Sequence, residues 1–302
     1  MNSITIGYIY GSQNLTDEEE LFQKVAKEKN INLIFFNVAD KMMLEELEDK
    51  IKQCDLVFNN TAGTLAQEII KMAELMGKKT SSDSKVYYYI EDKWMFFLKC
   101  KKAGIPTPET MLLSGNFHAV KKQLVEFNQW PIILKRVTGE QGEFVQKAEN
   151  YEEAVDIIKN FYEKGNERLP IIGQQYIKSH SYRVTVVGEK IVQTAIKKGY
   201  GWKATGMYAE KSEKFDLDEK LIALTKKLIK TCKVDVCGID YLKKDDQWYA
   251  LEINSEPSLD FFKEEKETLI SEILELLKNK CVISQDKSSE IALSLPSPSP
   301  QK

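Results

Sequence analysis

The chain has little histidine and no paired-cysteine motif, and these two scarcities argue against a zinc site. Its 302 residues include two histidines, His118 and His180, and five cysteines that form no CxxC pair. Zinc sites draw their ligands mainly from these two residue types. Cys237 lies in an apolar run, which favours a buried core thiol. We therefore expect free thiols, no zinc and a reducing compartment, the cytoplasm.

Long hydrophobic runs and an excess of one charge are also missing. No apolar stretch reaches membrane-spanning length, and the start, Met1-Asn-Ser-Ile-Thr-Ile-Gly, lacks the charged and apolar regions of a secretion signal. The 43 basic and 46 acidic residues give a net charge of −3, and the basic residues are mixed with acids rather than gathered in a stripe. We expect no membrane and no nucleic-acid partner. The composition leaves open whether the protein forms a homo-oligomer.

The first third of the chain lacks the GxGxxG fingerprint of a dinucleotide site but has an alternating α/β pattern. Three strand patterns alternate with three helical ones: strands at 4–10, 31–36 and 55–59, and helices that begin near Thr16, Met42 and Leu65. This alternation predicts a small parallel sheet with right-handed crossovers. The polar loop 59–63 after the third strand fits either a ligand-binding loop or a helix N-cap.

A hairpin near the C-terminus carries three oxygen-bearing side chains in an apolar body. Its two apolar runs flank a polar turn at 243–247. Asp240 lies in the first run, and Glu252 and Asn254 point to one face of the second, because strand side chains alternate. Two carboxylates and an amide oxygen are hard ligands, suited to Mg²⁺ beside phosphates. The alternative is that the carboxylates meet solvent or a nearby Lys.

Cationic side chains follow two other predicted strands. Lys135 ends the strand 130–136 and precedes a loop with Gly139 and Gly142. Glycines let backbone N–H groups close over phosphates, and a Lys at a strand end adds positive charge. An ordinary turn, with the Lys side chain reaching out of the core, explains the same letters. Arg183 begins the hairpin 182–197 and suits a carboxylate or phosphoryl group, or equally a strand carboxylate.

The hairpin pattern Gly238-Ile-Asp with Leu251-Glu-Ile-Asn-Ser-Glu-Pro257 resembles the metal-binding hairpin of ATP-grasp enzymes. It is most similar to that of the RimK-like carboxylate–amine ligases. Asp92-Lys93 before Gly104-Ile-Pro-Thr-Pro108 resembles the same family. The resemblance implies an N-terminal parallel α/β (pre-ATP-grasp) domain followed by a two-subdomain ATP-grasp fold, of α/β and α+β class.

The expected boundaries follow from this resemblance and from the composition of the C-terminus. We expect the N-terminal domain at 1–83, the ATP-grasp domain at 84–282 with its lid subdomain at about 109–175, and a disordered Ser/Pro-rich tail at 283–302.

The resemblance also implies roles for individual residues. Contacts to ATP are expected from Lys93, Lys135, Gly139, Gly142, Gln174, Gln175, Tyr176, Ile177 and Lys203. Magnesium, with Mn²⁺ as an alternative, is expected on Asp240, Glu252 and Asn254. The catalytic residues are then Arg183, which would stabilise the oxyanion of a tetrahedral intermediate, and Lys203, which would hold nucleotide and acyl phosphate. No His in these motifs offers a general base for the amine.

The sequence departs from the family pattern at three positions. Gln175 stands where Glu is usual, Thr205 where Asn is common, and Phe144 where Gly is often found. The first change removes a charge beside the nucleotide, and the second changes the region expected to hold acyl phosphate. Phe144 could stiffen the loop that closes over the phosphates.

The function implied is ATP-dependent ligation of a carboxylic acid to an amine, forming an amide or peptide bond through an acyl phosphate. The expected substrates are an amino acid or a peptide. Two alternatives stay open on the sequence: a small-molecule kinase on the same fold, similar to inositol phosphate kinases, and a nucleotide-binding regulator without turnover.

Overall fold

The computed structural model describes residues 3–139, 144–163, 170–198, 202 and 211–293. Contacts divide the chain into two compact units, Met1–Ser84 with Phe262–Lys302, and Lys85–Phe261. The first boundary falls beside the expected one at 83, whereas the C-terminal segment joins the first unit rather than extending the second.

The first unit is built on a parallel sheet, as the α/β alternation predicts. Its strand order is β2-β1-β3-β4, with the strands β1 (Ile4–Tyr10), β2 (Ile31–Asn37), β3 (Leu56–Asn59) and β4 (Lys79–Ser81). The helices are α1 (Asp17–Glu28), α2 (Leu44–Gln53), α3 (Thr64–Leu75) and α9 (Lys266–Leu293). Thr16 and Glu19 form a capping box at the start of α1.

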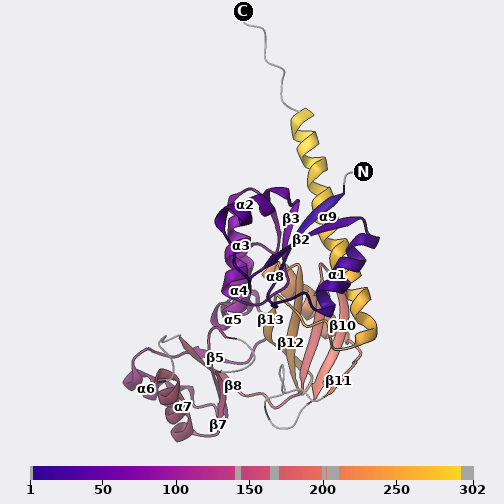
Figure 1. The fold of residues 1–302 in the computed structure, drawn as a ribbon. Coiled ribbons are helices and arrows are strands. Elements are labelled where there is room, and N and C mark those ends of the chain that lie inside the picture. Colours follow the sequence, from indigo (N-terminus) through magenta and orange to yellow (C-terminus); the bar gives the residue numbers. More distant parts are fainter. Residues whose placement is uncertain (1–2, 140–143, 164–169, 199–201, 203–210, 294–302) are drawn as a thin grey trace, which may run out of the picture. The chain divides into compact units, whose positions relative to one another are not determined.

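Helix α9 ties the end of the chain to the first unit. It packs against α1 (Figure 1). Between the two segments, Lys24 pairs with Glu267 and Lys266 pairs with Glu18, each at 2.9 Å. The predicted start of the tail, at 283, lies inside this helix. No glycine or proline interrupts 266–293, and the prolines that suggested disorder begin only at Pro296. Residues 294–302 lie outside the described residues.

The second unit begins with two helices and a small antiparallel sheet. Helix α4 (Ser84–Glu91) ends before Asp92, which caps the N-terminus of α5 (Lys93–Ala103). Helix α5 ends at Gly104, which has a left-handed conformation. The lid sheet has the order β5-β8-β6-β7, with β5 (Thr110–Leu112), β6 (Ile132–Arg136), β7 (Val145–Ala148) and β8 (Ile171–Gln175).

Helices α6 (Phe117–Phe127) and α7 (Tyr151–Glu163) cover one face of the lid sheet, with a core that includes Leu124, Leu134 and Ile158 (Figure 1). The larger sheet of this unit is antiparallel, in the order β11-β10-β9-β12-β13. Its strands are β9 (Ser181–Val187), β10 (Lys190–Lys198), β11 (Lys211–Glu213), β12 (Val236–Lys244) and β13 (Gln247–Asn254).

One face of the larger sheet packs against α5 and α8 (Glu219–Cys232) and forms the main core of the second unit. Val184, Ile239 and Tyr241 on this face are fully buried, and Leu221 and Leu228 meet them from α8. Because side chains alternate along a strand, the residues between these apolar ones point to the opposite face. That opposite face carries the predicted site.

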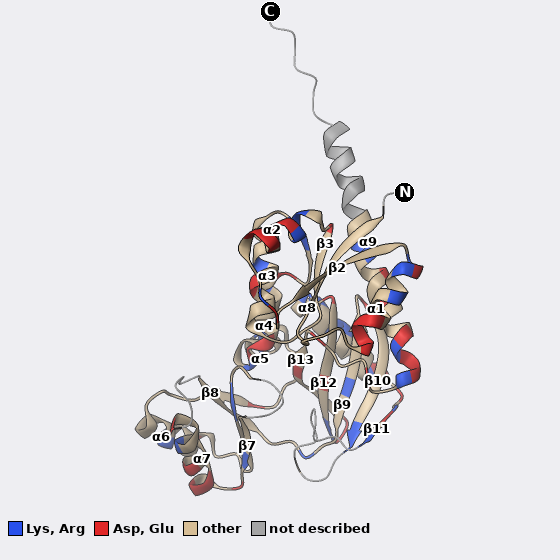
Figure 2. Cartoon of the chain, viewed as in Figure 1, with Lys and Arg blue, Asp and Glu red and all other residues tan. Residues whose placement is uncertain are grey.

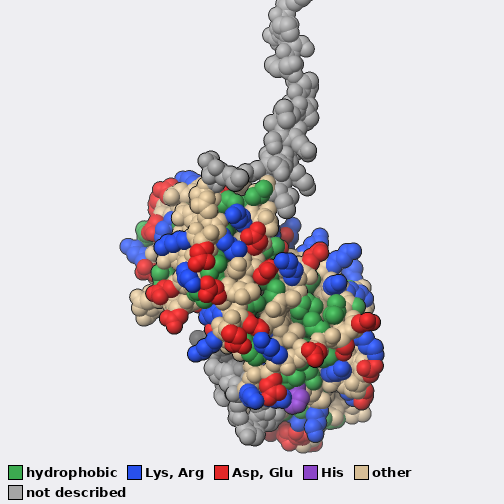
Figure 3. Space-filling view, turned by 90° about the vertical axis from the view of Figure 1, so that its right-hand side faces the viewer, with side chains coloured by type: hydrophobic (Ala, Val, Ile, Leu, Met, Phe, Trp, Pro, Cys, Tyr) green, Lys and Arg blue, Asp and Glu red, His purple; other side chains and the backbone are tan. Residues whose placement is uncertain are grey.

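The surface and the thiols agree with the composition. Acidic and basic side chains are interspersed on the face seen in Figure 3, without a single-sign patch. All five cysteines are free and buried, Cys237 completely. No helix in the described part of the chain is both long and apolar enough to cross a membrane.

Candidate functional site

The hairpin β12–β13 brings the three predicted metal ligands together. Asp240 lies directly opposite Glu252, and Asn254 lies opposite Gly238. The amide nitrogen of Asn254 donates to the Gly238 carbonyl at 3.3 Å, and no described residue donates to its side-chain oxygen. The oxygen is therefore the end of Asn254 that is left for a ligand. The turn is shorter than predicted, since β12 extends to Lys244 and β13 begins at Gln247.

Asp240 is enclosed by two cations from the neighbouring strands. Arg183 on β9 donates from Nε to Oδ1 at 2.7 Å and from Nη2 to Oδ2 at 3.0 Å. Lys197 on β10 lies with Nζ 2.8 Å from Oδ1 and 2.9 Å from Oδ2. Burial by itself raises the pKa of Asp240, but Arg183 and Lys197 outweigh it and hold this pKa below its usual range. Asp240 is therefore ionised.

These residues form a row across the sheet. Arg183 pairs with Asp240 in the β9–β12 register, and Asp240 pairs with Glu252 in the β12–β13 register. Charged residues mark the neighbouring strands β9 and β10 in Figure 2. The order of side chains along the row is cation, anion, anion, with Lys197 as a second cation on Asp240. Such a row attracts a divalent ion at the Glu252 end and an anion at the Arg183 end.

Gly238 allows Arg183 to lie flat across β12. A Cβ at Gly238 would stand 2.4 Å from Nη1 and 2.9 Å from Cδ of Arg183. Non-bonded contacts of a Cβ atom are essentially never shorter than 3.0 Å, so any larger residue would displace the guanidinium. Phe261 adds a cation–π contact, with the guanidinium carbon 5.7 Å from the ring centre. Arg183 is thus held by Asp240, Gly238 and Phe261 together.

Lys135 and Lys93 lie at the phosphate loop that sequence analysis predicts. Lys135 is 4% exposed, and burial lowers its pKa to about 8, while Glu252 opposes this shift and Lys93 adds to it. The charges of Glu252 and Lys93 thus both act on the Lys135 ammonium. Lys93 also holds the loop, since its backbone N–H donates to Val137 at 2.8 Å and its ammonium donates to the Gly139 carbonyl at 2.9 Å.

The conformation of Gly139 and the contacts of Phe144 explain why these residue types occur in the loop. Gly139 has φ of 130°, which favours glycine. Phe144, at the far end of the loop, packs edge-on against Phe161 and lies under the Arg136 guanidinium at 3.5 Å. The departure at Phe144 therefore anchors the loop end to the lid core. Gly142 lies outside the described residues.

The predicted adenine segment is partly used for structure. Gln174 is buried and its amide donates to Thr110 at 2.9 Å. The Tyr176 N–H donates to the Pro131 carbonyl at 3.3 Å, so this donor is not available to a nucleotide. The Gln175 side chain and the Ile177 backbone make no hydrogen bond to a described residue. Lys147 lies over the Tyr176 ring at 4.4 Å.

Sequence analysis predicted site residues that lie outside the described residues, and it did not predict one residue that contacts Asp240. Lys203 and Thr205, expected at the acyl phosphate, lie outside the described residues. Lys197 was missed, although a signal was present: Gln193, Ala195 and Lys197 alternate along the strand that pairs with Arg183. A Lys at an inward position of a strand next to a buried acid is the pattern that identifies it.

The donor set fits a divalent ion of the Mg²⁺ type. Glu252, Asn254 and Asp240 offer two carboxylates and one amide oxygen on adjacent strands. All three donors are oxygen atoms, which suit Mg²⁺ or Mn²⁺ better than metals that prefer sulfur or imidazole ligands. Glu252 lies near enough to Lys135 to raise its pKa, so a metal here would also be near the phosphate loop.

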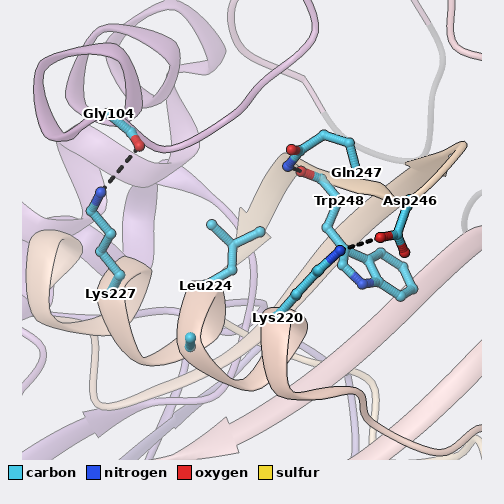
Figure 4. A pocket seen from close by; sticks show the side chains of 8 residues that line it. Gly104, Lys220, Leu224, Lys227, Asp246, Gln247 and Trp248 are labelled. Carbon is cyan, nitrogen blue, oxygen red and sulfur yellow. Dashed lines mark hydrogen bonds and ion pairs between the residues drawn. The ribbon is translucent and has the colours of Figure 1, made fainter.

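A separate hollow of about 340 Å³ lies between α8 and the turn of the β12–β13 hairpin (Figure 4). Lys220 pairs with Asp246 at its rim, and Lys227 donates to the Gly104 carbonyl at 3.1 Å. Trp248 forms one wall, and its indole N–H donates to Asp218 at 2.8 Å. None of the predicted site residues lines this hollow.

The fold matches solved ATP-grasp structures. A RimK domain ATP-grasp protein from Sphaerobacter thermophilus aligns with a TM-score of 0.74 at 15% identity, over 90% of this chain and 98% of that one. D-alanine–D-alanine ligase from Bacillus anthracis aligns with a TM-score of 0.70 at 18% identity, over 94% and 99%. The class of protein is therefore the ATP-grasp fold, and the predicted fold class is confirmed.

The family follows from the sequence comparison. Residues 90–277 match the RimK-like ATP-grasp domain, and the chain belongs to this family. A probable alpha-L-glutamate ligase of Haemophilus influenzae is 27% identical over 213 residues, 68% of each chain. A protein of the same description from Legionella pneumophila is 28% identical over 222 residues, 70% of this chain and 71% of that one. The resemblance drawn from the motifs is confirmed.

Proposed function

We propose that this chain is an ATP-dependent carboxylate–amine ligase that activates an acid as an acyl phosphate and joins it to the amine of an amino acid or peptide. The relatives described as alpha-L-glutamate ligases make glutamate the first amino acid to test. The observation that supports the proposal is the row Arg183–Asp240–Glu252, in which Arg183 and Asp240 are buried and Glu252 is half-buried and acts electrostatically on the buried Lys135.

The proposed reaction has two chemical steps, phosphoryl transfer and acyl transfer. A substrate carboxylate oxygen attacks the γ-phosphorus of ATP, the bond to the β–γ bridging oxygen breaks, and ADP leaves. Lys93 and Lys135 neutralise the phosphates. An amine nitrogen then attacks the acyl carbon, the C–O bond breaks, inorganic phosphate leaves, and the nitrogen loses a proton. Arg183 stabilises the oxyanion of the tetrahedral intermediate, which forms when the amine attacks and collapses when the C–O bond breaks.

Magnesium, or manganese in its place, completes the site. When bound at Glu252, Asn254 and Asp240, the ion would supply positive charge beside the β- and γ-phosphate oxygens. The donor chemistry of these three side chains and the unengaged oxygen of Asn254 support this assignment. The base that receives the amine proton is not among the residues of the row.

The experiment is an ATP-turnover screen that pairs glutamate and other amino acids with small acids and peptides, followed by mass spectrometry of products. Hydroxylamine is added in parallel without amine. The ligase predicts a hydroxamate formed in step with ADP, because hydroxylamine captures an acyl phosphate. A stable phosphoester of a hydroxyl compound instead would identify a kinase, and nucleotide binding without turnover on any pair would identify a regulator.

A further inference from the structure

Two cations contact the Asp240 carboxylate, although one is enough to neutralise its charge. Arg183 alone neutralises the carboxylate with a two-bond fork, at 2.7 and 3.0 Å. Lys197 adds a second cation, is only 2% exposed, and lies within 2.9 Å of both oxygens. Burying an ammonium group costs desolvation free energy, which a favourable interaction with a buried partner must offset. The second cation therefore calls for an explanation beyond the stability of a salt bridge.

The contacts leave Asp240 no unused acceptor site. Each carboxylate oxygen has two lone pairs. Oδ1 meets Arg183 Nε at 2.7 Å and Lys197 Nζ at 2.8 Å, and Oδ2 meets Arg183 Nη2 at 3.0 Å and the same Nζ at 2.9 Å. A metal ion that binds Asp240 must therefore replace one of the two cations.

Lys197 is the cation that can move. Arg183 is fixed by its fork, by the space over Gly238 and by the Phe261 ring. Lys197 is a point charge on a flexible four-carbon chain. Ser181 lies opposite Lys197 in the β9–β10 register, and its buried hydroxyl has no hydrogen-bond partner among the described residues. The displaced ammonium thus has an acceptor close by.

We propose that Lys197 is a placeholder cation: its ammonium occupies the place on Asp240 that the divalent ion takes, and metal binding moves it aside. This inference deepens the proposed function, because it rests on Asp240 being a metal ligand. It assigns to Lys197 a positioning role. The lysine keeps Asp240 ionised and in place before the metal arrives, and then adds its charge to the phosphate side of the site.

The test compares Lys197→Met with Lys198→Met in the full chain. Lys198 is the adjacent residue, points to the other face and pairs with Glu213, so it is a matched control. Free Mn²⁺ is measured by electron paramagnetic resonance with ADP present at saturating concentration, and ADP binding is measured by calorimetry in EDTA. Neither readout needs turnover, so the result is separate from the success of the ligase screen.

The affinities for Mn²⁺ and for metal-free ADP are expected to change in opposite directions in Lys197→Met. Lys197→Met binds Mn²⁺ about fivefold more tightly, because one competing unit charge is gone, and binds metal-free ADP about fivefold more weakly. Lys198→Met changes neither value. A merely structural lysine would weaken both. Mn²⁺ affinity that is unchanged or weaker in folded Lys197→Met would overturn the inference.

A second variant covers the case in which Lys197→Met does not fold. Lys197→Arg keeps the charge and offers a broader donor set that competes more strongly for Asp240. It should bind Mn²⁺ more weakly than the native protein, with ADP binding in EDTA nearly unchanged. Mn²⁺ affinity in Lys197→Arg equal to or tighter than native would equally contradict a placeholder role.

Discussion

The two faces of the strands β9, β12 and β13 use adjacent residues for opposite purposes. Ile239 is fully buried against α8, while the next residue, Asp240, is as deeply buried among cations on the other face. On the first face the contacts are mainly apolar, with one buried hydrogen bond between Tyr241 and Thr225, and on the second the contacts of Asp240 are ion pairs with Arg183 and Lys197. The comparison teaches that burial alone does not separate a core residue from a site residue, whereas the chemistry of the buried partner does.

The largest effect expected on the polar face comes from Glu252→Ala. The Glu252 side chain makes no hydrogen bond to a described residue, so replacing it with a methyl group should not unfold the sheet, but the change removes a proposed metal ligand. ATP turnover should fall by about a thousandfold or more, with the melting temperature within about 3 °C of native. Asp246→Ala, on the exposed turn of the same hairpin, serves as control. Activity near the native level in Glu252→Ala would remove the metal assignment.

The apolar face should respond in the opposite way. Ile239→Ala leaves a cavity against Leu221 and Leu228 and should lower the free energy of unfolding by about 3 kcal/mol. Urea unfolding measures this change, and ADP affinity measured on the folded variant should stay at the native value. A stable Ile239→Ala with impaired ADP binding would show that the two faces are not separable.

Gly238→Ala is a smaller change at the border of the two faces. The added Cβ lies 2.4 Å from Arg183 Nη1, so the guanidinium must shift while the backbone stays in place. We expect kcat to fall about thirtyfold, since Arg183 acts on the intermediate, and ADP affinity to change by less than about threefold. Gly115→Ala, at a glycine with open space around it, is the control. A rise in KM with native kcat would argue against the role given to Arg183.

The smallest effect is a pH dependence from Lys135. Folding lowers its pKa from 10.5 to about 8, so the cost of burying its charge is fully present below pH 8 and shrinks as pH rises towards 10.5. Phosphates need the charged form, and ADP affinity should therefore drop about three- to tenfold between pH 7 and pH 9. Lys135→Arg, which stays charged, should flatten the profile measured by calorimetry. A native profile as flat as that of the Arg variant would contradict the assignment.

The sequence predicted much of this arrangement because local rules determine it. Strand alternation places Glu252 and Asn254 on one face, and β9 and β10 form the hairpin expected at 182–197. The α/β alternation likewise predicted the parallel sheet of the first unit.

What the sequence could not predict depends on pairing between strands. The contact of Lys197 with Asp240 requires the β10–β9–β12 order, which no local pattern states. Gly238 looks like an ordinary strand glycine until Arg183 is seen lying across it. The use of the Tyr176 N–H by Pro131 also follows from tertiary pairing, as does the packing of α9 on α1.

The most direct test is a crystal structure with ADP and Mn²⁺, in which anomalous scattering locates the metal independently of the protein. The account predicts a manganese peak about 2.2 Å from side-chain oxygens of Glu252 and Asn254, with the β-phosphate next to Lys135. A peak bound only by phosphates and water, with the Glu252 and Asn254 side chains turned away, would contradict it.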